Sequence, residues 1–114
     1  MDSKVLVGVD IGGTKCAVTI GLPKNGDLDI LDKKSLPTTD VWGTIESVKT
    51  AIRDVLARNS LAVKDIQAIG ISCGGPLDSR TGVIMSPPNL PGWDNIPIVR
   101  ILSEEFGFKA AVHN

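Results

Sequence analysis

The sequence predicts a mixed α/β domain, and three features of the chain support this. Short apolar, β-branched runs near the N-terminus have the composition of buried strands. Two later segments repeat apolar residues at the three- and four-residue spacing of amphipathic helices. An apolar strand follows each of these segments, and alternation of strand, helix and strand implies a parallel portion of the sheet. The predicted order is β-β-β-α-β-α-β, with helices packed on a mixed sheet.

Three strands are expected first, over about residues 4–10, 14–22 and 26–36. Asn25-Gly26 separates the second strand from the third and is a strong signal for a two-residue hairpin turn. The opening hairpins add antiparallel strands to the sheet. The segment Pro37–Gly43 is expected to be a linker that leads into the first helix.

Two amphipathic helices are expected. The first runs from Thr44 to Arg58, with charged residues opposite its apolar face, and Asp40 or Thr44 would cap its N-terminus. The second begins at Pro97, a residue suited to the first helical position, and Gly107 stands where a C-cap glycine belongs. The expected buried residues are Ile45, Val48, Ile52, Val55 and Leu56 in the first helix and Ile98, Ile101, Leu102 and Phe106 in the second.

The remaining strands are short. Ile66–Ser72 is expected to be a central strand, and Gly70 within it indicates close approach by another backbone or by a ligand. A small hairpin is expected to turn through Ser79–Gly82. The last strand is expected over Lys109–Asn114.

Length, charge and cysteine content restrict the function classes. A chain of 114 residues forms one domain at most and is long enough for a real core. The net charge of −1, with Lys and Arg scattered, argues against binding to nucleic acid. No signal peptide or membrane span is visible, so no membrane contact and a cytoplasmic location are expected. Cys16 and Cys73 lie in apolar strand contexts and are expected to be reduced core residues.

The candidate ligand-binding element is the turn that follows Asp10, where Gly12 and Gly13 are adjacent. Such a strand–turn–strand connection leaves backbone N–H groups uncovered, and concavities of this kind hold phosphate. Thr14 adds a hydroxyl and Lys15 adds a cation. The Asp10 carboxylate would repel bare phosphate but suits phosphate that arrives with Mg²⁺. An ordinary hairpin with a Gly-Gly turn is the alternative.

Other chemistries find less support. A P-loop needs four residues between its glycines and a helix after them, whereas a strand follows this turn. The dinucleotide fingerprint G-x-G-x-x-G is absent as well. His113 is the only histidine, so a Ser-His-Asp hydrolase would depend on this one residue, which reads more simply as a polar residue at a strand end.

The proline-rich loop Ser86–Asp94 is a second candidate site. Its prolines reduce the conformational entropy of the loop. The Asn89 side chain both donates and accepts hydrogen bonds, which matches sugar hydroxyls, and Trp93 would face the apolar side of a sugar ring. In the alternative interpretation, Trp93 anchors the core and Asn89 is a turn residue. A phosphate turn and a sugar-suited loop together suggest transfer of phosphate to a sugar.

Four segments carry a resemblance to a known family: Asp10–Lys15, Gly70–Asp78, Asn89–Trp93 and Val112–Asn114. In this order and spacing they resemble the first phosphate loop, the second glycine-rich segment, the sugar-binding loop and the start of the Asn-Asp catalytic motif of the ROK family (repressors, open reading frames, kinases). The resemblance implies a ribonuclease H-like fold of the actin-like ATPase superfamily.

The resemblance also implies an activity, that of an ATP-dependent hexose kinase, most similar to glucokinases, that phosphorylates the sugar 6-hydroxyl. The residues that would line the ATP phosphates are Gly12, Gly13, Thr14 and Lys15. Asp10 would act through Mg²⁺ or a bound water. The residues that would lie against the hexose are Gly75, Asn89 and Asn114.

The chain stops at Asn114, one residue before the position of the family's catalytic aspartate. Residues 1–114 are therefore expected to be the N-terminal lobe of a two-lobe sugar kinase, with the C-terminal lobe and the general base absent from this chain. Such a fragment is expected to be inactive and to self-associate through its exposed lobe interface. A sugar-responsive ROK regulator, which normally carries a helix-turn-helix before the first strand, and a non-catalytic binding lobe are the alternatives.

Overall fold

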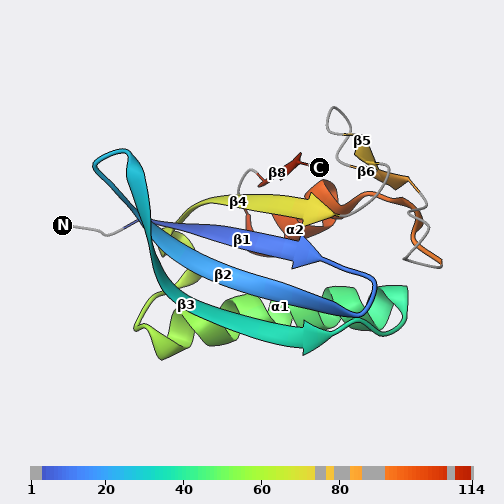
Figure 1. Ribbon diagram of the computed structural model, residues 1–114, viewed down its shortest axis with the longest axis horizontal. Helices are drawn as coiled ribbons and strands as arrows, with labels where there is room; N and C mark the ends of the chain where they lie inside the picture. Colours follow the sequence, from blue (N-terminus) through green and yellow to red (C-terminus); the bar gives the residue numbers. More distant parts are fainter. Residues whose placement is uncertain (1–3, 74–76, 79–82, 86–91, 108–109, 114) are drawn as a thin grey trace.

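The computed structural model describes residues 4–73, 77–78, 83–85, 92–107 and 110–113 of the 114-residue chain. Its largest feature is a five-stranded sheet with the strand order β3-β2-β1-β4-β8 (Figure 1). The strands are β1 (Val5–Ile11), β2 (Lys15–Lys24), β3 (Asp27–Pro37), β4 (Ile66–Cys73) and β8 (Ala110–His113). Two helices, α1 (Val41–Arg58) and α2 (Ile98–Phe106), pack on the sheet.

The sheet is mixed, as predicted. β1 is parallel to β4 and β4 is parallel to β8, whereas β1 and β2, and likewise β2 and β3, are antiparallel. Asn25 and Gly26 have φ angles of 51° and 80°, which is the backbone that the predicted two-residue hairpin turn requires. The ribonuclease H-like arrangement expected from the sequence is confirmed in these strands and helices.

One face of the sheet forms the core. Alternate residues of β1 are buried, because successive side chains of a strand point to opposite faces. The buried residues are Val5, Val7, Val9 and Ile11 in β1, Cys16, Val18 and Ile20 in β2, and Ile66, Ile69, Ile71 and Cys73 in β4. They belong to one cluster with the five apolar residues predicted for the buried face of α1. Both cysteines are buried and free, which confirms their predicted structural role.

Helix α1 begins at Val41 rather than at Thr44, so residues 41–43 belong to the helix and not to a linker. Its N-cap is Asp40, one of the two predicted candidates, whose carboxylate accepts a hydrogen bond from the Gly43 N–H at 3.1 Å. The Thr44 side chain is buried instead and accepts a hydrogen bond from the Thr39 N–H at 2.8 Å. The cap, and not the apolar spacing, therefore sets where this helix starts.

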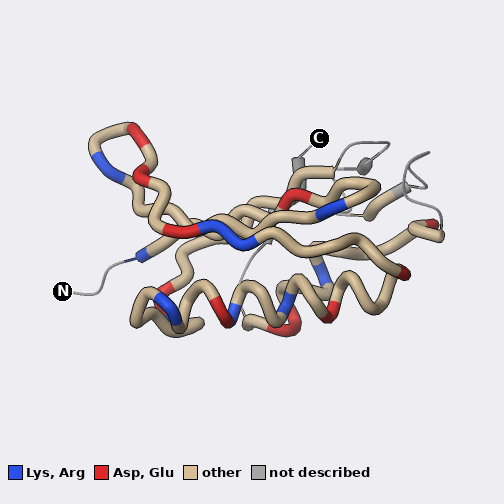
Figure 2. Tube along the Cα trace, turned by 60° about the horizontal axis from the view of Figure 1, so that its bottom comes forward, with Lys and Arg blue, Asp and Glu red and all other residues tan. Residues whose placement is uncertain are grey.

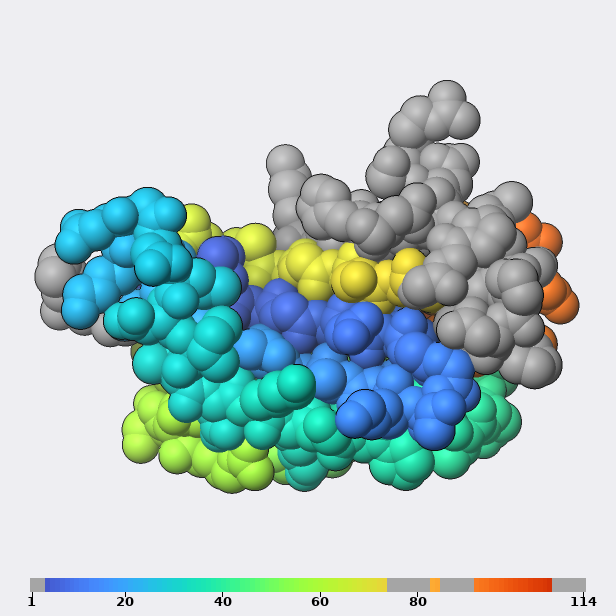
Figure 3. Space-filling model, in the orientation of Figure 1, coloured from blue at the N-terminus to red at the C-terminus, as the bar shows by residue number. Residues whose placement is uncertain are grey.

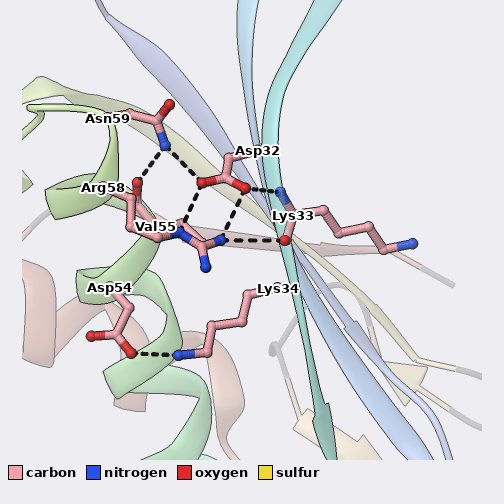
Figure 4. A network of polar contacts seen from close by, with 7 residues as sticks. All are labelled: Asp32, Lys33, Lys34, Asp54, Val55, Arg58 and Asn59. Atoms are coloured by element: carbon pink, nitrogen blue, oxygen red, sulfur yellow. Dashed lines mark hydrogen bonds and ion pairs between the residues drawn. The ribbon is translucent and has the colours of Figure 1, made fainter.

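The C-terminal end of α1 is fixed to β3 by a polar network (Figure 4). The Asp32 carboxylate accepts hydrogen bonds from the Asn59 amide at 2.9 Å and from Arg58 at 3.0 and 2.9 Å. The hydrogen bond from Asn59, reinforced by those from Arg58, lowers the pKa of Asp32 from its usual value. Further along the helix, Lys34 Nζ lies 2.6 Å from Asp54 Oδ2. These contacts hold the edge strand against the helix.

Helices α1 and α2 lie against each other on the same face. Glu105 of α2 accepts from Arg53 at 2.6 Å and lies 3.3 Å from Lys49, both on α1. Hydrogen bonds from Arg53 and then Lys49 lower the pKa of Glu105. Both acidic and basic residues lie along α1 (Figure 2). Gly107 has a φ of 73°, which confirms the predicted C-cap.

A second, three-stranded sheet consists of β5 (Leu77–Asp78), β6 (Val83–Met85) and β7 (Asp94–Ile96), all antiparallel. The pairing of β5 with β6 agrees with the predicted hairpin, whose turn lies outside the described residues. The sequence does not predict strand β7, because its three residues follow a proline-rich segment and show no alternation of apolar and polar residues. A short 3₁₀ helix, η1 (Val63–Asp65), precedes β4. None of the described helices is long and apolar enough to cross a membrane.

Candidate functional site

The candidate phosphate turn is formed by Gly12–Thr14, between the end of β1 and the start of β2. Gly12 is half-buried, whereas Gly13, Thr14 and Lys15 are exposed. The hairpin therefore presents the predicted hydroxyl and cation together at one end of the sheet. The exposed Asp10 lies just before the turn, paired with Ala17 of β2 on one side and Ser72 of β4 on the other.

Gly12 is required by a close backbone approach. A Cβ atom at this position would lie 2.7 Å from the Lys15 carbonyl oxygen, which is nearer than real Cβ contacts allow. The described glycines with positive φ are Gly26, Gly92 and Gly107, so neither Gly12 nor Gly13 is needed for a left-handed backbone. Gly12 thus allows the compact form of the turn, and Gly13 beside it is exposed.

Thr38, in the segment between β3 and α1, supports the turn. Its backbone N–H donates to the Thr14 carbonyl at 2.9 Å, and its hydroxyl donates to the Gly12 carbonyl at 2.7 Å. The single hydroxyl proton is used in that bond, so the Cys16 thiol, whose Sγ lies 3.3 Å from the hydroxyl oxygen, donates in the third contact. Sequence reasoning missed Thr38, because 26 residues separate it from Gly12 and no local pattern marks it.

The sheet face opposite the core carries small residues beside the turn. A cavity of about 210 Å³ on this face is lined by Gly8, Val9, Asp10, Ala17, Thr19, Gly70, Ile71 and Ser72. A second cavity of about 440 Å³ continues over the same strands toward Leu6 and Leu28. Figure 3 looks onto this face, where atoms of β1, β2 and β4 are visible. A Cβ at Gly70 would meet nothing within 4 Å, so the predicted close approach of another backbone is absent among the described residues.

Asp10 is the candidate metal-binding residue. No group of three or more His, Cys, Asp or Glu side chains gathers within the described part of the chain. A single carboxylate beside a phosphate turn fits Mg²⁺ all the same, because Mg²⁺ is usually held by one or two carboxylates together with substrate phosphates and waters. Burial, followed by the nearby Asp10 charge, raises the pKa of the Cys73 thiol. That thiol is therefore protonated at neutral pH and is no competing metal ligand or nucleophile.

The three predicted sugar-binding residues, Gly75, Asn89 and Asn114, lie outside the described residues, and their roles stay predictions. Trp93 is described and is only 1 % exposed. This burial agrees with the alternative interpretation, in which Trp93 anchors the core. His113 is the last residue of β8 and is the register partner of Ser72, in agreement with a position at a strand end.

Comparison with known proteins shows which family the chain resembles. Residues 6–114 match the model of the ROK family. The chain is 31% identical over 112 residues to a glucokinase of Thermotoga maritima, and the matched region covers 96% of this chain and 33% of that protein. It is 33% identical to the solved ROK hexokinase of Thermus thermophilus, with a TM-score of 0.80 over 96% of this chain and 35% of that one.

A third similar structure is a ROK family transcriptional regulator described as a homologue of the Escherichia coli MLC protein. It is 12% identical, with a TM-score of 0.81 over 98% of this chain and 28% of the regulator. At this identity the likeness concerns the fold alone. The chain spans about a third of the length of the glucokinase and the hexokinase that it matches.

Proposed function

The chain belongs to the ROK family, and from this premise we propose that it is the N-terminal lobe of an ATP-dependent hexose kinase. The hexose that fits the resemblance best is glucose, phosphorylated at its 6-hydroxyl. The two relatives of highest identity named above, a glucokinase and a hexokinase, support a sugar kinase. Because the chain spans only about a third of each relative, the kinase activity that we propose is that of a complete two-lobe protein.

The observation that carries the proposal is the turn itself. Gly12 packs closely against the Lys15 carbonyl, and residues 13–15 are exposed in the described part of the chain, so the turn is accessible there. An ordinary hairpin needs no such packing and no neighbouring carboxylate. Here Asp10 lies at the end of the strand that enters the turn, which suits a metal-bound phosphate.

Each candidate residue would have its own role in binding. Gly12, Gly13, Thr14 and Lys15 would hold the ATP phosphates, and Asp10 would hold Mg²⁺ directly or through a water. The metal supplies neutralisation of phosphate charge when it is bound. Gly75, Asn89 and Asn114 would orient the sugar. Positioning and charge neutralisation dominate phosphoryl transfer, so these roles are those of a lobe that aligns two substrates. None of these residues is a general base, and this chain by itself is expected to be inactive.

A regulator and a non-catalytic binding lobe are the competing functions, because the regulator has the same fold. A sugar-responsive regulator needs the sugar loop but has no use for nucleotide phosphates at the turn. Binding of Mg²⁺·ATP therefore separates the kinase from the regulator more directly than binding of sugar does.

Substitution of Lys15 tests the nucleotide part of the proposal. Lys15→Ala removes the cation at the turn and is expected to weaken Mg²⁺·ATP binding by at least about tenfold, because hydrogen bonds to charged groups are worth about 1.5–3 kcal/mol. Isothermal titration calorimetry of the chain with Mg²⁺·ATP measures this. Lys24→Ala, at an exposed lysine at the far end of β2, is the matched control. Equal weakening of Mg²⁺·ATP binding by both substitutions, or no weakening by either, would contradict a specific phosphate site.

A further inference from the structure

Thr38 controls the direction of peptide groups in the phosphate turn. A trans peptide unit is planar, so its C=O and the N–H of the following residue point in opposite directions. The Gly12 carbonyl accepts from the Thr38 hydroxyl at 2.7 Å, and the Gly13 N–H must therefore point away from Thr38. The Thr14 carbonyl accepts from the Thr38 N–H, so by the same reasoning the Lys15 N–H points away from Thr38.

Thr38 is itself held firmly. It follows β3, whose last residue Pro37 is paired with Lys15 of β2, and it lies two residues before the N-cap of α1. Its hydroxyl oxygen accepts a hydrogen bond from the Cys16 thiol, and its hydroxyl proton is donated to the Gly12 carbonyl, so the hydroxyl is held as both acceptor and donor. The Cys16 side chain is buried in the core. The turn is thus tied to the core through one side chain.

We propose that Thr38 is a positioning residue, which holds the Gly12–Gly13 peptide so that the Gly13 N–H is directed outward to a phosphate oxygen of the nucleotide. This rests on the proposed function, since the phosphate is that of Mg²⁺·ATP. A donor that already points at its acceptor needs no reorganisation when the charge arrives. A turn that must first be ordered loses conformational entropy on binding, and the affinity falls accordingly.

The test separates the Thr38 hydroxyl from the rest of the residue. Thr38→Val removes the hydroxyl and keeps the shape and the N–H, whereas Thr38→Ser keeps the hydroxyl. Thr39→Val makes the same change one residue further on, where the hydroxyl has no contact with the turn among those described. The ¹⁵N-labelled chain provides two readouts: the order parameter of the Gly13 amide without ligand, and the dissociation constant for Mg²⁺·ATP from amide shifts.

In Thr38→Val we expect the Gly13 order parameter to fall from about 0.85 to about 0.6 or below, the range of flexible backbone. Mg²⁺·ATP binding should weaken about threefold to tenfold, the effect of one lost hydrogen bond. Thr38→Ser and Thr39→Val should stay within about twofold of the unmodified chain. If Thr38→Val does not fold, Thr38→Ala is the second hydroxyl-free variant, with the same expected result.

Two further results would separate this inference from the proposed function. An unchanged order parameter and an unchanged dissociation constant in the hydroxyl-free variants would overturn the positioning role and leave the phosphate site intact. Absence of Mg²⁺·ATP binding by the unmodified chain would overturn the proposed function and the phosphate role of Gly13. The ligand-free order parameters would then still decide whether Thr38 orders the turn.

Discussion

Two glycines of the site, Gly12 and Gly70, differ in what their missing side chains allow. At Gly12 a Cβ would meet a backbone oxygen at 2.7 Å, whereas at Gly70 a Cβ would meet nothing within 4 Å. Neither has the positive φ that would exclude other residues on backbone grounds. Gly12 therefore allows the geometry of the turn. Gly70 leaves the cavity beside Asp10 free of a side chain at that position.

Gly12→Ala should lower the free energy of unfolding by about 1–3 kcal/mol, because the turn must shift to admit the methyl group. Gly70→Ala, the matched control in open space, should stay within about 0.5 kcal/mol of the unmodified chain. Urea unfolding of the two variants measures both values. Equal losses of stability would mean that the close approach at Gly12 does not constrain the turn.

At the scale of elements, α1 connects the edge strand to the phosphate turn. Its C-terminal end is bonded to β3 through Asp32, Arg58 and Asn59, and its N-cap follows directly on the segment that contains Thr38. Because β3 pairs with β2 along its full length, anchoring of β3 by the helix also restrains the strand that leaves the turn. The polar network is thus part of the framework that positions the site.

Asp32→Asn tests this anchor. The pKa of Asp32 is lowered in the folded chain, so the carboxylate stabilises the fold above its unfolded pKa of about 3.8, and this contribution is lost as the pH falls through the lower folded value. We therefore expect a lower melting temperature for the variant at pH 7 and a difference that shrinks below about pH 4. Asp29→Asn, at an exposed residue 3.8 Å from Lys24, is the control and should change little. A difference independent of pH would refute the charge-based anchor.

At the scale of the whole molecule, the helices cover one face of the sheet and leave cavities on the other. The edge strand also carries exposed apolar side chains, and Ile30 is 58% exposed. Exposed apolar surface of this kind favours association. We expect the chain to self-associate as its concentration rises, and Ile30→Lys to shift it toward the monomer in sedimentation velocity. Trp42→Lys replaces an equally exposed residue on α1 and should have no effect. A monomer at all concentrations, or a response to Trp42→Lys alone, would refute this interface.

Local signals in the sequence predicted the fold where one residue decides the geometry. Asn25-Gly26, the Asp40 cap and the Gly107 C-cap each act through their own backbone or side chain, so each was found without knowledge of the fold. Strand β7 is visible only through its pairing with β6. Thr38 acts on a carbonyl 26 residues away, a contact that only the sheet register creates.

Gly13→Val tests most directly whether the turn binds nucleotide phosphates. A β-branched side chain at this exposed position would block the approach of the phosphates while the strands on either side remain paired. Calorimetric titration with Mg²⁺·ATP and a melting curve on the same samples give the two numbers needed. We expect that binding is lost and that the melting temperature stays close to that of the unmodified chain. Unchanged binding, or a lower melting temperature with no specific loss of Mg²⁺·ATP affinity, would mean that the turn is an ordinary hairpin.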